Sequence, residues 1–223
     1  MKISRNTINT LKNYASINSN LVFKPGQKLR TISDSKTIMS GAETVEDFPV
    51  EFGIYDLNEF LSVYALFEDP DLEFEHKSVL ISAGEQSIRY YFSETDILTQ
   101  PSKDIIMPES EFNILMPAAT LDKIRRAASV LGHTDMSIEG SEGKISVLIF
   151  DAKDATSNTY NIDLDGDNDC KNEFNFVFNI ANLKMIQGDY KLTISSKLIS
   201  QWSNVDQPVE YFIALEKSSK FRA

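Results

Sequence analysis

Apolar residues recur at helical spacing near the N-terminus of the chain, and the positions between them are polar or basic. Between residues 6 and 17, Ile8, Leu11 and Ala15 fall on one face of a helix, with the i, i+3, i+7 spacing of a face turned towards a core. Ser4 precedes this segment and is a suitable N-cap. The opposite stripe consists of Arg5, Asn9, Lys12 and Ser16. The pattern predicts a surface helix with a basic outer face.

A second segment of the same kind lies just past the middle of the chain. Thr120 can cap a helix there, and the apolar face of this helix consists of Leu121, Ile124, Ala128 and Leu131. The positions beside that face include Lys123, Arg125 and Arg126. A third helix is predicted over residues 57–64, with Asp56 as its N-cap. Because it carries Asp56 and Glu59, it differs from the two basic helices.

Short apolar runs separated by turn signals predict strands in the rest of the chain. In the first half they cover residues 21–23, 29–32, 36–40, 48–54, 72–74, 79–82 and 88–92. Residues 95–111, which include Pro101 and Pro108, are predicted to form a connector with a strand at 105–107. In the second half the predicted strands cover residues 112–116, 136–138, 145–150, 160–164, 174–178, 191–195, 199–202 and 209–215, with a short helix over 181–185.

The order of elements before residue 110 is repeated after it, which indicates an internal duplication. An offset of 113 aligns Leu11, Lys12, Ala15, Ser16 and Ile17 with Ile124, Arg125, Ala128, Ser129 and Val130. We therefore predict an α+β fold of two similar domains, 1–110 (with the connector from about residue 95) and 111–223, in which helices lie on one face of mostly antiparallel sheets.

Charge is distributed unevenly along a chain whose net charge is −11. Residues 2–18 and 120–131 together hold six basic residues and one acidic residue, Asp122, whereas the remainder holds 16 basic and 32 acidic residues. Basic charge is thus concentrated in two predicted helices of an acidic protein. No run of about 20 apolar residues is present, so we expect no membrane span, and the N-terminus lacks a signal-peptide pattern.

Sequence motifs for catalysis are missing, so we expect no enzyme, no cofactor and no resident metal. The chain lacks P-loop, nucleophile-elbow and zinc-protease patterns, and its two histidines, His76 and His133, are interpreted as surface or capping residues. Cys170 lies among acids that would raise a thiol pKa, which disfavours a nucleophile. Residues 161–169 resemble a calcium loop, but Asn172 stands where a bidentate Glu is needed. An exposed acidic turn is the favoured interpretation.

Three stretches of the chain resemble a known family. They are Leu11-Lys12-Asn13-Tyr14-Ala15-Ser16-Ile17-Asn18-Ser19, Ile54-Tyr55-Asp56-Leu57-Asn58-Glu59-Phe60-Leu61, and Phe174-Asn175-Phe176-Val177-Phe178-Asn179-Ile180-Ala181-Asn182-Leu183-Lys184-Met185 followed by Gly188-Asp189-Tyr190-Lys191-Leu192. In this order, and at this chain length, they resemble the sliding clamps, or DNA polymerase processivity factors, of T-even-type bacteriophages. The resemblance is weakest over residues 95–111.

The resemblance implies a fold, partners and a cellular setting. Such clamps are ring-forming homotrimers with two similar domains per subunit, in which helices line a central hole that holds duplex DNA without sequence specificity. The implied partners are DNA, further copies of the chain, the replicative DNA polymerase, an ATP-driven clamp loader and, for late transcription, phage factors with RNA polymerase. The implied location is the cytoplasm of the infected bacterium.

The predicted site residues follow from the basic helices and from this resemblance. A sliding protein needs diffuse attraction to phosphates, because bidentate base contacts would hold it at particular sequences. The residues expected to face DNA are Arg5, Lys12, Lys123, Arg125 and Arg126, with Lys2 and Lys184 as weaker candidates. Clamp architecture places subunit contacts at Ile105, Met107, Tyr160 and Ile162, and a partner-peptide pocket at Ile106 and Phe212, with the C-terminal Phe221 as a further contributor.

Two other functions are compatible with the residues alone. One is an acidic interaction module that does not encircle DNA, such as a nucleic-acid mimic, which would be a monomer or dimer. The other is a small metal-dependent hydrolase that uses Asp163, Asp165 and Asp167.

Overall fold

The computed structural model describes the chain except for residues 104, 142, 165–172 and 223. It divides into two compact units. The first contains Met1–Asp104, Lys184–Ile186 and Gln207–Tyr211, and the second contains Ile105–Leu183, Gln187–Asp206 and Phe212–Ala223. Because each unit includes separate segments of the chain, the two sequence domains 1–110 and 111–223 stay a prediction.

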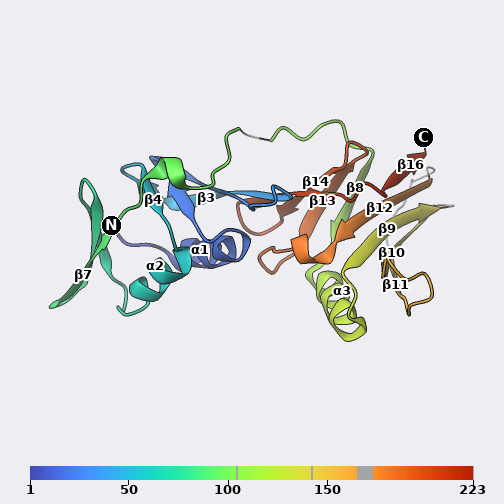
Figure 1. The fold of residues 1–223 in the computed structure, drawn as a ribbon, viewed down its shortest axis with the longest axis horizontal. Coiled ribbons are helices and arrows are strands. Elements are labelled where there is room, and N and C mark those ends of the chain that lie inside the picture. The colour runs from blue at the N-terminus through green and yellow to red at the C-terminus, as the bar shows by residue number, and fades with distance from the viewer. Residues whose placement is uncertain (104, 142, 165–172, 223) are drawn as a thin grey trace. The chain divides into compact units, whose positions relative to one another are not determined.

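The first unit combines two helices with short antiparallel ladders (Figure 1). Its elements are α1 (Arg5–Ile17), β1 (Leu21–Phe23), β2 (Gly26–Ile32), β3 (Ile38–Phe48), β4 (Phe52–Ile54), α2 (Leu57–Tyr64), β5 (Asp71–Phe74), β6 (Ser78–Ala83), β7 (Gln86–Tyr91) and the 3-10 turn η1 (Thr95–Ile97). Strand β1 pairs with β4, β2 pairs with β3, and β5, β6 and β7 form a sheet in that order. The helices α1 and α2 contact each other.

The second unit has one long helix and two groups of strands. Its elements are β8 (Phe112–Met116), α3 (Ala118–Leu131), β9 (Asp135–Ser141), β10 (Lys144–Phe150), β11 (Tyr160–Leu164), β12 (Glu173–Asn179), the 3-10 turn η2 (Ile180–Asn182), β13 (Tyr190–Ser195), β14 (Ile199–Asn204), part of β15 (Val209–Ala214) and β16 (Lys220–Arg222). One sheet has the order β11-β10-β9-β12-β16. In the other group, β13 lies between β8 and β14.

The order of elements confirms the predicted duplication. The series α1-β1-β2-β3-β4-α2-β5-β6-β7 is matched by α3-β9-β10-β11-β12-η2-β13-β14-β15. In the second series the helix predicted over 181–185 is a 3-10 turn that begins at Ile180. The α+β class with antiparallel strands is likewise confirmed.

One predicted strand is absent, and two others have different bounds. Residues 105–107 form no strand, because Pro101 and Pro108 flank a stretch of irregular chain. The strands predicted at 36–40 and 48–54 are instead one long strand, β3, and the short strand β4. The prediction overlooked that buried and exposed residues alternate along β3 from Ala42 to Phe48, with Glu46 on the buried side.

Helix α1 packs on the core through a face that is rotated from the predicted one. Its buried residues are Thr7, Thr10, Leu11, Tyr14 and Ile17. Ile8 and Ala15 are only half-buried, because the large Tyr14 side chain fills the core instead. The Tyr14 hydroxyl donates to Leu29 O at 3.4 Å and accepts a hydrogen bond from Ser40 Oγ at 3.2 Å. Burial raises the pKa of this hydroxyl, which therefore stays protonated.

No helix in the described ranges is long and apolar enough to cross a membrane.

Replacing Tyr14 tests whether this side chain holds α1 in place. Tyr14→Ala removes a fully buried aromatic ring, so we expect a loss of about 3–5 kcal/mol in the free energy of unfolding. Tyr14→Phe keeps the ring and should cost about 1 kcal/mol. Urea denaturation followed by circular dichroism measures both. Equal effects of the two variants would show that the hydroxyl, and not the ring, anchors the helix.

Candidate nucleic-acid interface

The outward stripe of α1 is basic and free of acidic residues. Arg5, Asn9, Lys12 and Ser16 are all exposed or half-exposed, as the sequence predicted. The helix contains no Asp or Glu. Neither Arg5 nor Lys12 makes an ion pair within the part of the chain that the structure describes. Both cations are therefore available to a phosphate.

On α3 the structure separates the three cations by their surroundings. Lys123 and Arg126 are exposed, whereas Arg125 is half-buried. The Arg125 guanidinium donates to Leu183 O at 3.1 Å and lies 3.8 Å from Asp122 Oδ1. Arg125 is thus held by its own unit, and the outward stripe of α3 runs through Ala119, Lys123, Arg126 and Val130.

The burial patterns of α1 and α3 correct the alignment of the two helices by one residue. At an offset of 114, the buried or half-buried positions Thr7, Thr10, Tyr14 and Ile17 match Leu121, Ile124, Ala128 and Leu131. Asn9 then matches Lys123, and Lys12 matches Arg126, with all four exposed. The sequence alignment paired Lys12 with Arg125, because it followed residue identities and could not see burial.

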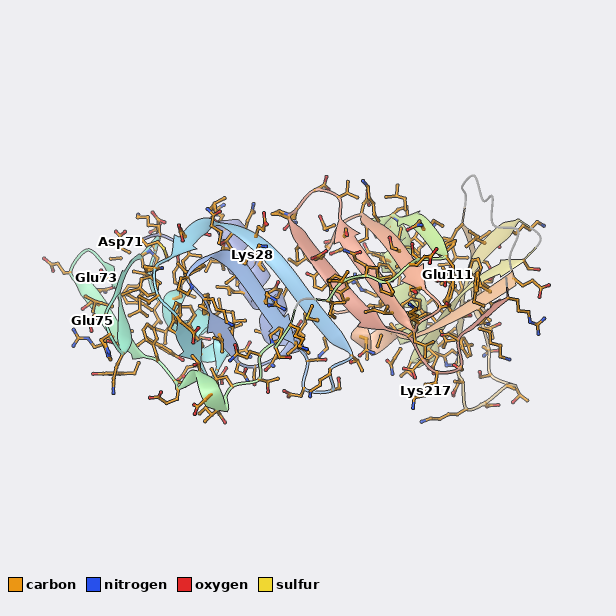
Figure 2. The ribbon with its side chains drawn as sticks, turned by 90° about the horizontal axis from the view of Figure 1, so that it is seen from above. Lys28, Asp71, Glu73, Glu75, Glu111 and Lys217 are labelled. Atoms are coloured by element: carbon orange, nitrogen blue, oxygen red, sulfur yellow. The ribbon has the colours of Figure 1, made fainter. Side chains whose placement is uncertain are left out.

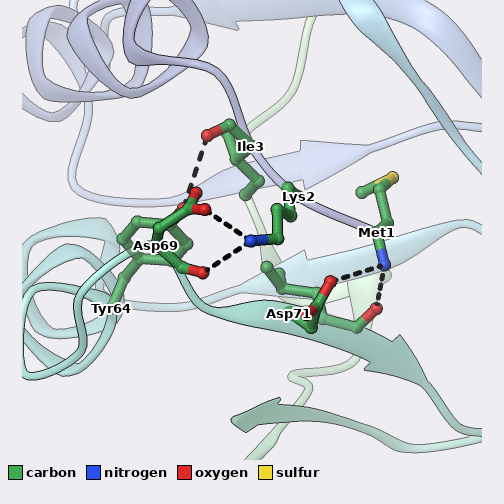
Figure 3. Close-up of polar contacts among 7 residues, drawn as sticks. Met1, Lys2, Ile3, Tyr64, Asp69 and Asp71 are labelled. Atoms are coloured by element: carbon green, nitrogen blue, oxygen red, sulfur yellow. Dashed lines mark hydrogen bonds and ion pairs between the residues drawn. The ribbon is translucent and has the colours of Figure 1, made fainter. Parts of the chain in front are cut away.

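The two weaker candidates, Lys2 and Lys184, are exposed but already hydrogen-bonded. Lys2 Nζ donates to Asp69 Oδ2 and forms an ion pair with it (Figure 3). This hydrogen bond raises the pKa of the Lys2 ammonium. Lys184 Nζ donates to Ser16 O at 2.6 Å, in the last turn of α1. A cation at that end of a helix stabilises its dipole, so Lys184 has a structural role there.

Carboxylates from outside the helices accept hydrogen bonds at the N-termini of α1 and α3. On α1 the N-cap is Ser4, as predicted, and its Oγ accepts from Thr7 N at 3.2 Å. The Glu46 carboxylate accepts hydrogen bonds from Ser4 N and from Thr7 Oγ1. Desolvation by burial would raise the pKa of Glu46, but these hydrogen bonds outweigh it and lower the pKa below its usual value. Asp189 Oδ1 accepts from Ala118 N at 2.7 Å, at the start of α3. Sequence reasoning missed both acids, because neither lies near its helix in the chain.

Of the four residues predicted for subunit contacts, two lie on a strand and two lie in irregular chain. Tyr160 and Ile162 lie on β11, a terminal strand of its sheet. Ile105 and Met107 are half-buried residues of irregular chain, so the strand on which their assignment depended does not exist. In the first unit β5 and β7 are the two terminal strands of the sheet that has β6 at its centre, and β7 pairs with β6 among the described residues.

The two residues predicted for a partner-peptide pocket differ in their exposure. Ile106 is 88% exposed, whereas Phe212 is a core residue with 5% exposure. Phe221, expected at an exposed tail, lies on β16, and its ring stacks on that of Phe176. A hollow of about 300 Å³ beside β16 is lined by other residues, among them Glu139, Asn175 and Lys220.

The acidic turn at 161–169 is described only as far as residue 164, so Asp165 and Asp167 lie outside the described residues, as does Cys170. Among the residues that are described, no group of three acids, histidines or cysteines could hold a metal ion. Elsewhere, Asp71, Glu73 and Glu75 lie close together in the first unit (Figure 2).

The different surroundings of Arg125 and Arg126 lead to opposite expectations for two neighbouring arginines. Arg125→Ala removes a charged donor from Leu183 O, so we expect a loss of about 1 kcal/mol in the free energy of unfolding. Arg126→Ala should change it by less than about 0.5 kcal/mol, because the side chain is exposed. Thermal unfolding of both variants checks this. A larger loss from Arg126→Ala would contradict the assignment.

Comparison with known proteins places this fold in a family. The family described as DNA polymerase processivity factor matches residues 2–99, and the gp45 sliding clamp C-terminal family matches residues 113–217. The chain is 30% identical to the sliding clamp of Vibrio phage KVP40 (97% of this chain, 99% of that protein). It is 31% identical to the sliding clamp of Enterobacteria phage T4, with 98% of both proteins covered.

Solved structures show the same fold at lower sequence identity. The proliferating cellular nuclear antigen of Entamoeba histolytica is similar with a TM-score of 0.66 and 13% identity, over 94% of each chain. The Pseudomonas aeruginosa DNA polymerase sliding clamp gives a TM-score of 0.69 at 14% identity, over 100% of this chain and 65% of that one. From these matches and from the duplicated α+β architecture, the chain belongs to the family of bacteriophage sliding clamps, the DNA polymerase processivity factors.

Proposed function

We propose that this chain works as a homotrimeric ring that encircles duplex DNA and tethers the replicative polymerase, without catalytic activity of its own. An ATP-dependent clamp loader opens the ring, and the clamp co-activates late transcription with phage factors and RNA polymerase. The site of action is the cytoplasm of the infected bacterium. Family membership supports these roles.

The basic stripes of α1, which contains no acid, and of α3, whose one acid Asp122 lies near Arg125, are the observation that carries the DNA-binding part of the proposal. Each stripe presents two exposed cations, Arg5 and Lys12 on α1 and Lys123 and Arg126 on α3. Cations on a helix attract phosphates without reading bases, so the attraction is the same at each step along the duplex. The two weaker candidates, Lys2 and Lys184, are hydrogen-bonded within the chain and would contribute less. Arg125 would support α3 and not contact phosphates directly.

Two terminal strands support the ring part of the proposal. On β7, Ile88 lies opposite the buried Ile81, which puts Arg89 on the other face; on β11, Ile162 lies opposite the buried Val147, which puts Asp163 on the other face. If β7 of one subunit joined β11 of the next, Ile88 and Ile162 would lie on one face, and Arg89, which is paired with Glu75 at 2.9 Å in its own chain, would lie on the same face as Asp163. A head-to-tail contact of this kind closes into a ring.

Partner binding is supported by a solved relative. In one structure the C-terminal region of FEN-1 is bound to the A. fulgidus PCNA, whose fold is similar to this chain with a TM-score of 0.70 at 13% identity. We propose that the polymerase and the clamp loader dock through short segments in a comparable way. Phe212 would not contact such a segment without leaving the core, whereas Ile106 is exposed.

Removing one cation from each basic stripe tests the DNA-binding face. In the Lys12→Ala, Arg126→Ala double variant we expect weaker association with duplex DNA, and the slope of log K against log salt should decrease by about 0.9 for each phosphate that is no longer neutralised. Fluorescence anisotropy with a labelled short duplex measures both quantities.

The matched control for this test is the Lys28→Ala, Lys217→Ala double variant. It also removes one exposed lysine from each unit, and neither Lys28, on β2, nor Lys217, after β15, belongs to α1 or α3 (both are labelled in Figure 2). If the control weakens DNA binding as much as the Lys12, Arg126 pair does, the assignment of the DNA-binding face is wrong and only net charge matters.

The oligomeric state tests the ring. Native mass spectrometry should give a mass near three times 25.2 kDa. Tyr160→Glu, on the terminal strand β11, should shift the population towards the monomer, because an extra charge would be buried at the contact. Val45→Glu is the control, since Val45 is 79% exposed on β3. A monomeric wild-type protein at every concentration would instead support an acidic interaction module that does not encircle DNA.

A further inference from the structure

The two basic helices share an arrangement at their N-termini that the acidic helix lacks. Neither α1 nor α3 has an acidic residue in its first turn. On α1, Glu46 of β3 supplies a carboxylate to Ser4 N and Thr7 Oγ1. On α3, the N-cap is Pro117, which offers no side-chain hydrogen bond, and Asp189 bonds Ala118 N at 2.7 Å.

Helix α2 serves as an internal comparison. Its N-cap is Asp56, whose carboxylate accepts hydrogen bonds from Asn58 N and Glu59 N. Glu59 adds a second acid to its first turn. Thus the helix without a basic stripe carries its own N-terminal acids, whereas the two helices with basic stripes receive theirs from other segments.

Helix physics explains why an acid is needed at each of these starts. The first turn carries unpaired N–H groups and a partial positive charge of about 0.5 elementary charge, which a nearby carboxylate stabilises. On α1 the need is greater, because Arg5 is the first residue of the helix and adds a full positive charge. Glu46 meets this need from the core side of the helix, since it is only 7% exposed.

An acid in the usual place would interfere with phosphate binding. An Asp or Glu exposed in the first turn would lie within about one Debye length, 8–10 Å, of phosphates bound along the same stripe. Its repulsion would cancel part of the attraction from Lys12. On α1, the buried Glu46 carboxylate bonds Ser4 N and Thr7 Oγ1 from behind the helix and leaves the outer stripe free of negative charge. Helix α3 differs, because Asp122, whose side chain is 40% exposed, lies one turn before Arg126.

We propose that Glu46 is a positioning residue for DNA binding, which holds the start of α1 from outside the helix so that no acid stands on the stripe of α1 that faces phosphate. This inference rests on the proposed DNA-binding function. According to this inference, DNA binding requires exposed cations on the stripe and also requires that the acids which stabilise the helix lie off the stripe.

Moving the acid from behind α1 to its exposed face tests the proposal. Glu46→Gln should lower Tm by roughly 2–6 °C. Adding Asn6→Asp, an exposed residue at the second position of α1, should restore part of that loss, because it returns a negative charge to the first turn. The same Asn6→Asp change should weaken binding to a short mixed-sequence duplex by about twofold at low salt, a loss that disappears at high salt.

The matched control is Asn58→Asp, the same substitution at the second, exposed position of α2. It adds an equal charge to the protein and should leave DNA binding unchanged. Should Glu46→Gln fail to fold, Asn6→Asp against Asn58→Asp in the wild-type background still decides the question.

The outcomes separate this inference from the function on which it rests. Equal DNA binding by Asn6→Asp and Asn58→Asp, or no recovery of Tm in the Glu46→Gln, Asn6→Asp double variant, overturns the positioning role. If the positioning role is overturned while the Lys12→Ala, Arg126→Ala variant still loses DNA affinity, the assignment of the DNA-binding face remains supported. If that variant keeps full affinity, the DNA-binding face itself is wrong, whereas the Tm measurements report on helix capping alone.

Discussion

In the proposed function, a few lysine and arginine side chains attract the phosphates of DNA, although the protein has eleven more acidic than basic residues and its net charge repels DNA. At physiological ionic strength the interaction between exposed charges extends about 8 Å, so local surroundings outweigh net charge. The chain therefore needs surfaces on which cations stand without acidic neighbours. The outward stripe of α1 meets this requirement, and the carboxylate at the start of α1 comes from Glu46 of β3. Helix α3 meets it in part, because Asp122 lies one turn before Arg126 and is placed beside Arg125.

Core packing decides which cations stand on those stripes. Tyr14 is fully buried and sets the rotation of α1, so that Lys12 is exposed. On α3, the buried Leu121 and Ile124 leave Arg126 exposed but turn Arg125 towards Leu183 O. Of two adjacent arginines, one is available for phosphate and the other stabilises the fold. A helix turns by about 100° per residue, which is enough to separate their roles.

The proposed function assigns subunit assembly to the strands and DNA binding to the helices. Their terminal members, β7 and β11, each combine an apolar face with a charged one, and the charges are of opposite sign at Arg89 and Asp163. An exposed terminal strand has unpaired N–H and C=O groups that can pair with another chain. In a monomer such pairing leads to aggregation, whereas in a ring it joins one subunit to the next. The proposed function thus assigns DNA binding to helices and assembly to strand edges, with no residue required for catalysis.

The sequence by itself determined the α+β class, the duplication and the location of the basic helices, because hydrophobic periodicity and charge are local properties. It also placed Tyr160 and Ile162 on a strand, β11. Only the tertiary structure decided the rest. Whether Arg125 or Arg126 is free depends on Leu183, and the acids at the helix starts come from Glu46 and Asp189. The absence of a strand at 105–107 and the burial of Phe212 were likewise invisible in the pattern. In each of these cases the deciding partner, backbone pairing or packing involves residues far apart in the chain, and no local pattern encodes such contacts.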